Sequence, residues 1–140
     1  MKKGLSLVEI LLALSILALF AGPIAYLFLS TNRARVSARE LSLAMNLSSS
    51  YLSSLKDLPR SEINILPPTS DQEVPSILSP HHLGIPAPPQ RFHRSLEIRE
   101  LAGQVGLADA YLMIVKVRWS RGENLTPGEF HLESVLPGEE

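Results

Sequence analysis

The hydrophobic pattern divides the chain into an apolar beginning, an amphipathic stretch, a proline-rich stretch and an alternating C-terminal part. Between Leu5 and Leu29, fifteen of 25 residues are Leu, Ile, Val or Phe, and Glu9 is the one charged residue. As a helix this segment would be about 37 Å long, which exceeds the roughly 30 Å hydrocarbon core of a bilayer. The pattern therefore predicts a transmembrane helix over residues 5–29.

The energetics of insertion favour this helix despite its carboxylate. Fifteen large apolar residues contribute roughly −4.5 to −9 kcal/mol, whereas an acidic residue costs about 2.5–3.5 kcal/mol at the bilayer centre and less near an end, where Glu9 lies. Lys2 and Lys3 precede the run and favour a cytoplasmic N-terminus, although three arginines within residues 33–39 oppose that bias. Because the N-terminal end is only a few residues long, we expect it inside and the C-terminal domain in the periplasm or outside the cell.

A helix breaker lies within the apolar run. Pro23, preceded by Gly22, has no amide hydrogen, so the carbonyl of Leu19 loses its helical partner. In lipid such a residue is tolerated where the helix adjusts locally or a neighbouring helix helps. We expect a kink or a locally melted turn at residues 19–23; an ordinary membrane proline kink without a role is the alternative.

Residues 30–58 have the pattern of an amphipathic helix. Apolar or small residues spaced three and four apart form one stripe, at Ala34, Ala38, Leu41, Met45, Ser48, Leu52 and Leu55. Polar residues, Glu40 among them, fall elsewhere on the helix, and Pro59 blocks its continuation. We expect this stretch to continue the transmembrane helix; the alternative is a break near residues 30–32.

Residues 59–91 hold eight of the eleven prolines and show no sustained periodicity. This composition predicts an extended, irregular connector. His81 and His82 are the conspicuous pair within it, but adjacent side chains point apart on an extended chain. We therefore expect an exposed loop and no metal site.

From Gln90 onward the pattern alternates, as in strands. Residues 92–99, 111–119 and 130–136 each place apolar side chains on one face, and Tyr111 to Trp119 is the strongest of these segments. Three consecutive strands with short loops predict a three-stranded antiparallel meander over residues 92–140. Its apolar face would cover the helical stripe, which predicts an α+β fold.

Composition excludes several classes of protein. The chain has 140 residues, no cysteine and a net charge of −1, so it is one small domain without disulfides, Cys-ligated zinc or a catalytic thiol. No nucleophile motif, phosphate loop or paired carboxylates stand out, so we expect no enzyme and no cofactor. Arg91, Arg94 and Arg99 could form a small basic patch, but nucleic-acid binding needs more positive charge, and we expect a solvated face.

The first residues carry a more specific signal. Residues 2–9 read Lys-Lys-Gly-Leu-Ser-Leu-Val-Glu, directly before an unbroken apolar run. This combination resembles the cleavage and methylation signal of type IV pilins and type II secretion pseudopilins. The resemblance implies that a prepilin peptidase removes leader residues 1–4 by cutting between Gly4 and Leu5, and methylates the new amine of Leu5. It also implies that Glu9 pairs with the amine of a neighbouring subunit; a tolerated interfacial carboxylate is the alternative.

The resemblance implies a pilin fold, with one long N-terminal helix on a small sheet, and a structural role. Residues 115–119, Val-Lys-Val-Arg-Trp, also look like a sheet segment of V-type minor pilins and I-type minor pseudopilins, and a plain core strand is the alternative. The small globular part and the lack of cysteine favour a minor subunit. Expected partners are the prepilin peptidase, other pilin or pseudopilin subunits through the N-terminal helix, the inner-membrane assembly platform and the lipid bilayer.

Two other classes of protein stay open. A bitopic membrane scaffold or sensor would keep its whole N-terminus and never assemble. An exported domain would be released by an ordinary signal peptidase, but no convincing small-residue cleavage site follows the apolar run, and that run is longer than the usual 7–15 residues.

Overall fold

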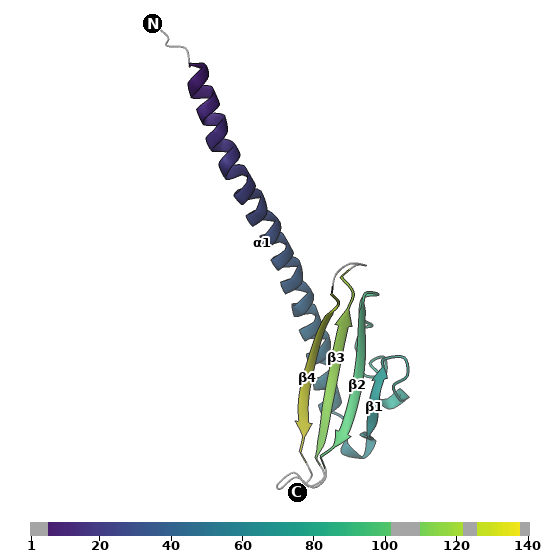
Figure 1. Ribbon diagram of the computed structural model, residues 1–140. Coiled ribbons are helices and arrows are strands. Elements are labelled where there is room, and N and C mark those ends of the chain that lie inside the picture. The colour runs from purple at the N-terminus through teal and green to yellow at the C-terminus, as the bar shows by residue number, and fades with distance from the viewer. Residues whose placement is uncertain (1–5, 102–109, 122–125, 138–140) are drawn as a thin grey trace. The chain divides into compact units, whose positions relative to one another are not determined.

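The computed structural model describes residues 6–101, 110–121 and 126–137. The chain separates into two compact units, residues 1–39 and 40–140. The elements, labelled in Figure 1, are α1 (Leu7–Lys56), the short 3-10 helices η1 (Arg60–Glu62) and η2 (Ser76–Leu78), and the strands β1 (Leu66–Ser70), β2 (Phe92–Glu100), β3 (Tyr111–Trp119) and β4 (Gly128–Leu136). Helix and antiparallel sheet together make the expected α+β arrangement.

Helix α1 continues through both positions where a break was considered. Residues 19–23 are helical although Pro23 lies among them, so no melted turn is present there, and a kink at Gly22-Pro23 stays a prediction. Residues 30–32 are helical as well. The helix ends at Lys56, three residues before Pro59, in agreement with the steric restriction that proline places on the residue before it.

The sheet has four strands, so the prediction of three was wrong. Their order is β1-β2-β3-β4, with every neighbouring pair antiparallel. The additional strand, β1, lies in the stretch predicted to be an irregular connector and contains Pro67 and Pro68. Proline cannot donate to a ladder and is confined to edges and bulges. β1 is an edge strand whose register with β2 shifts between Leu66 and Thr69, which is where the two prolines lie.

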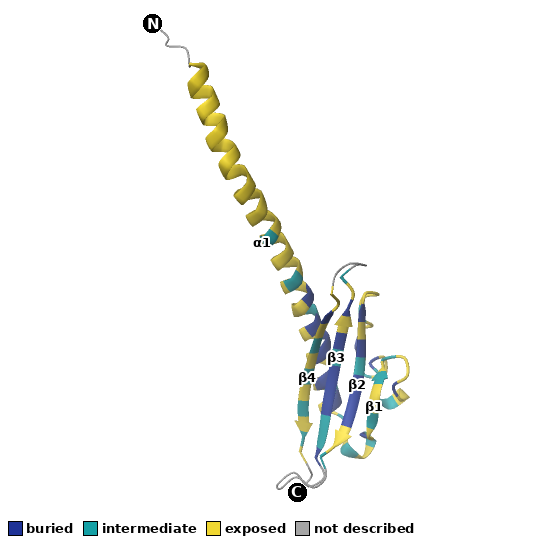
Figure 2. Ribbon diagram, in the orientation of Figure 1, coloured by how far each residue is buried: buried dark blue, intermediate teal, exposed yellow. Residues whose placement is uncertain are grey.

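The alternation of the other three strands is confirmed. Register pairs Phe92 with Trp119 and Leu96 with Val115, so the predicted inner positions of β2 and β3 meet on one face. Seven residues of α1, β2 and β3 form the centre of the main core cluster: Tyr51, Leu52, Leu55, Leu96, Ile98, Met113 and Val115. The proline-rich stretch adds Ile63, Val74, Leu78 and Ile85 to the same cluster, so it is a packed part of the core. Figure 2 shows this burial along β2 and β3.

The buried face of α1 differs from the predicted stripe in its first half. Ser48, Leu52 and Leu55 are buried as expected, but Leu41 and Met45 are 39% and 44% exposed. The buried positions there are Glu40, Ala44 and Leu47. The predicted stripe repeats every seven residues. On a straight helix of 3.6 residues per turn such a stripe rotates by about 20° per heptad, so it does not stay on the side of the helix that faces the sheet. The predicted polar position of Glu40 was therefore wrong, and its charge lies inside.

Candidate functional site

The N-terminal part of α1 presents an apolar surface with no cover from its own chain. Every large hydrophobic residue between Leu7 and Leu29 is about half exposed or more, from 48% for Ile10 to 75% for Phe28. This is the one helix, among the described residues, that is long and apolar enough to cross a membrane. Burying apolar area is worth about 25 cal/mol per Å², so covering this surface with lipid or with protein would be strongly favourable.

Glu9 and Ser6 cap the start of this helix. The Ser6 amide donates to Glu9 Oε2 at 2.9 Å, and the Glu9 amide donates to Ser6 Oγ at 3.3 Å. These reciprocal bonds form a capping box, which satisfies two amides that the first turn would otherwise leave unpaired. The Ser-x-x-Glu spacing was readable in the sequence but was not used. Within a single chain the Glu9 carboxylate therefore already has a hydrogen-bond donor.

The remaining residues predicted for processing or bending are placed only in part. Gly4 and Leu5 lie outside the described residues. Gly22 faces open space: a Cβ added there would meet no atom of the described chain within 4 Å. Packing within this chain therefore does not require a glycine at position 22.

A buried carboxylate joins α1 to the ends of two strands. Glu40 is 3% exposed and accepts three hydrogen bonds, from Arg91 Nη1 at 3.1 Å, Trp119 Nε1 at 3.1 Å and Arg121 Nε at 3.0 Å. The Trp119 ring stacks on Phe92, with centroids 5.7 Å apart. Two arginines and an indole N–H thus compensate a carboxylate that would be costly to bury alone.

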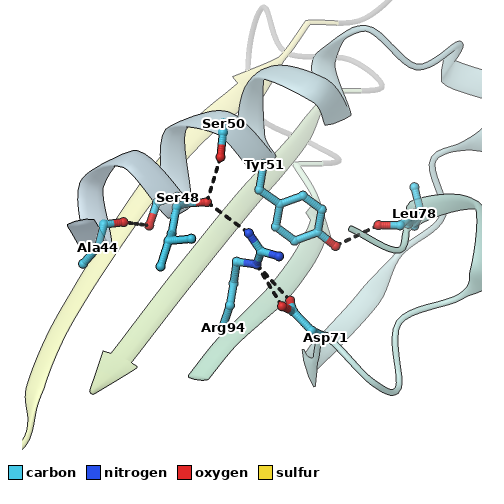
Figure 3. Close-up of polar contacts among 8 residues, drawn as sticks. Ala44, Ser48, Ser50, Tyr51, Asp71, Leu78 and Arg94 are labelled. Atoms are coloured by element: carbon cyan, nitrogen blue, oxygen red, sulfur yellow. Dashed lines mark hydrogen bonds and ion pairs between the residues drawn. The ribbon is translucent and has the colours of Figure 1, made fainter. Parts of the chain in front are cut away.

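A second buried ionic cluster lies nearer the middle of the sheet (Figure 3). Arg94 is 2% exposed, and its Nε donates to both carboxylate oxygens of Asp71, at 3.1 and 2.9 Å. Its NH1 donates to the Leu47 carbonyl of α1, and its guanidinium lies over the Tyr51 ring, 4.7 Å from the centroid. Tyr51 Oη donates to the Leu78 carbonyl at 2.8 Å. One side chain from β2 therefore ties the helix to the turn after β1.

Burial sets the protonation of this cluster. Desolvation raises the pKa of the Tyr51 hydroxyl far above its ordinary value, so the hydroxyl stays a neutral donor. Desolvation also raises the pKa of the Asp71 carboxyl, and the charge and hydrogen bonds of Arg94 oppose that rise. Arg94 NH2 is buried without a hydrogen-bond partner in the described chain.

The basic patch that the sequence analysis considered does not form, and the solvated face expected in its place was wrong for Arg94, which is buried. Arg94 is buried on Asp71, Arg91 pairs with Glu40, and Arg99 pairs with Glu97 across one face of β2. Alternation along β2 separates positions 94 and 99 onto opposite faces of the sheet. The alternation that places Phe92, Leu96 and Ile98 on the inner face of β2 places Arg94 there as well, and this is the signal in the sequence for its burial.

A shallow cleft of about 540 Å³ lies beside the second cluster. Its lining includes Asp71, His81, Phe92, His93 and Arg94. No group of three or more His, Cys, Asp or Glu side chains among the described residues could hold a metal ion.

Comparison with known proteins adds no assignment: no protein-family model, curated protein or solved structure matches this chain. Two features of the chain itself therefore bear on function. One is the uncovered apolar helix capped by Ser6 and Glu9. The other is the folded unit, in which Glu40 and Arg94 bind α1 to the sheet.

Proposed function

We propose that the chain is a minor pilin or pseudopilin, a structural subunit of a type IV pilus or a type II secretion pseudopilus, at or near the tip. A prepilin peptidase would cut between Gly4 and Leu5 and methylate the amine of Leu5. The observation that carries the proposal is an uncovered apolar helix that begins with the Ser6–Glu9 capping box directly after that cleavage sequence.

The apolar surface of residues 7–29 supports assembly as well as insertion. Before assembly the segment would lie in the bacterial inner membrane, with a cytoplasmic N-terminus and the C-terminal unit outside. In a filament the same surface would pack against the corresponding helices of neighbouring subunits. Both environments remove from water the side chains that the single chain leaves exposed.

Glu9 would then select the position of each subunit along the filament. In an apolar surrounding a carboxylate is costly unless it has a charged partner. Cleavage after Gly4 creates an α-amine at Leu5, about one helical turn from Glu9, and an incoming subunit brings a second such amine. The Ser6 amide already donates a hydrogen bond to this carboxylate, and the helix dipole favours negative charge at a helix N-terminus.

The test of processing is mass spectrometry of the full chain produced with and without an active prepilin peptidase. The expected product starts at Leu5 and carries one added methyl group, and Gly4→Ala should reduce its yield sharply. Glycine has no side chain, so the chain can lie extended in a narrow protease cleft. A chain that still starts at Met1 beside an active peptidase would contradict the proposal and favour an unprocessed bitopic scaffold or sensor. A mature end beyond residue 20 would instead indicate ordinary signal peptidase.

Assembly is tested separately with Glu9→Ala. This variant should stay in the membrane fraction, because removal of a carboxylate favours insertion, but it should not enter filaments. Glu129→Ala, which removes an exposed carboxylate from β4, is the matched control and should assemble normally. Normal numbers of filaments from Glu9→Ala would refute the pairing of Glu9 with a neighbouring amine.

A further inference from the structure

Three exposed arginines follow the apolar segment within ten residues. Arg33, Arg35 and Arg39 are the first charged residues after Glu9, and all three side chains are exposed. Five other arginines of the described chain form ion pairs with carboxylates: Arg91, Arg94, Arg99, Arg118 and Arg121. Arg60 instead donates to the Pro137 carbonyl and lies over the Tyr111 ring. No such pair involves the three arginines of α1 within the ranges that the structure describes.

The helix itself offers these arginines no counter-charge. Side chains on a helix meet those three and four residues away, and none of those positions around Arg33, Arg35 or Arg39 is acidic. Arg35 and Arg39 are four apart, so they repel each other. Glu40 is the nearest carboxylate in the sequence, but it is buried and already bonded to three donors of the sheet unit. The helix therefore supplies no carboxylate to these exposed side chains, and anions of a surrounding membrane can reach them.

The distance along the helix places two of the arginines at the membrane surface. Residues 7–29 span about 33 Å along the axis, or about 31 Å across a bilayer at an average tilt of about 20°, close to the hydrocarbon thickness of about 30 Å. Arg33 and Arg35 lie about 6 and 9 Å beyond Leu29 on the same axis. The headgroup layer of one leaflet is roughly 5–8 Å thick, and arginine side chains extend toward it. Arg39, about 15 Å beyond Leu29, lies past that layer.

We propose that Arg33 and Arg35 bind the phosphate groups of anionic phospholipids in the leaflet where the apolar segment ends. The inference rests on the membrane-spanning part of the proposed function and not on filament formation. A guanidinium presents paired N–H donors that match two phosphate oxygens. In phosphatidylglycerol no ammonium group lies beside the phosphate to cancel its charge, so this phosphate is preferred over that of zwitterionic phosphatidylcholine. The contacts hold the depth of the helix, since sliding it inward would carry both charges into hydrocarbon.

The test measures which lipids surround the full chain. The protein is reconstituted into phosphatidylcholine vesicles at physiological salt. Each sample contains a trace of either spin-labelled phosphatidylglycerol or spin-labelled phosphatidylcholine. Electron paramagnetic resonance then measures the fraction of each labelled lipid that the protein immobilises. We expect the association constant for phosphatidylglycerol to exceed that for phosphatidylcholine, with about five-fold of preference from each bound arginine. The preference should fall as salt rises. Arg33→Gln/Arg35→Gln should lose this contribution, whereas Arg39→Gln, which removes the same kind of charge farther out, should keep it.

Each outcome decides the inference. Because Lys2 and Lys3 are present in every variant, the difference between wild type and the double variant reports Arg33 and Arg35 alone. An unchanged preference in the double variant would overturn the proposal, and carboxylates of a neighbouring subunit would become the candidate counter-charge. An equal loss per removed charge in Arg39→Gln and in the double variant would overturn it too, because only net charge would then matter. If the protein immobilises neither labelled lipid, the membrane span itself is refuted. If it immobilises both labelled lipids equally, the span stands and only the preference for phosphatidylglycerol is lost.

Discussion

Replacement of Glu40 by glutamine tests whether a buried carboxylate holds α1 to the sheet. Glutamine keeps the size of the side chain but removes the charge and exchanges one acceptor oxygen for an amino group. Oε2 of Glu40 accepts from Trp119 and Arg121, and Oε1 accepts from Arg91. In the variant, at least one of these three donors therefore faces the amino group of the glutamine, which is itself a donor.

The exposure of the donors determines the size of the effect. Trp119 is 3% exposed, so its N–H reaches no water when it loses its acceptor, and such a loss costs about 1–3 kcal/mol. The side chains of Arg91 and Arg121 are 53% and 31% exposed, so they can turn toward water, and each lost pair is worth up to about 1 kcal/mol. We expect Glu40→Gln to lower the free energy of unfolding by about 2–4 kcal/mol.

Urea unfolding of the full chain in mild detergent measures this loss. Trp119 is the one tryptophan and lies in the cluster, so its fluorescence follows the folded unit. With a slope of about 1–2 kcal/mol per M, the midpoint should fall by roughly 1–4 M. Glu129→Gln is the matched control, because it breaks an exposed pair with Arg118 and should cost less than about 1 kcal/mol. A Glu40→Gln midpoint that moves no farther than the control, at the same slope, would refute the reasoning.

Two further predictions concern the sheet unit. Gly128 lies opposite Trp119, and a Cβ at position 128 would overlap the indole ring. Gly128→Ala should therefore lower the free energy of unfolding by about 1–3 kcal/mol, measured by urea unfolding. An unchanged unfolding midpoint would contradict this prediction. Burial raises the pKa of Asp71 above its ordinary 3.8, so its contribution to stability is full below pH 3.8 and falls as the pH rises through the raised pKa. The unfolding free energy of wild type minus that of Asp71→Asn should therefore decrease across this window; a constant or rising difference would count against it.

Local periodicity was enough to find the apolar helix and the inner faces of three strands. Tyr111 to Trp119 was predicted with the bounds that β3 has, because one of its two faces is wholly apolar or aromatic over nine residues. The edge strand β1 was missed because its prolines weaken the strand pattern, and only pairing with β2 gives Leu66–Ser70 its structure. The predicted cleavage residues Gly4 and Leu5 rest on sequence pattern alone.

Contacts between distant residues decided the rest. The Ser6–Glu9 capping box lies within four consecutive residues, so the sequence alone could have identified it. Glu40 and Trp119 are 79 residues apart, and Arg94 and Leu47 are 47 apart. The pattern of apolar and polar residues in a sequence indicates which face of a helix or strand a side chain occupies. It does not indicate which hydrogen-bond donor from a distant part of the chain lies opposite that side chain. The sequence by itself therefore determined where apolar surface had to be covered, and the tertiary structure decided which charges could be buried, because their partners meet only after folding.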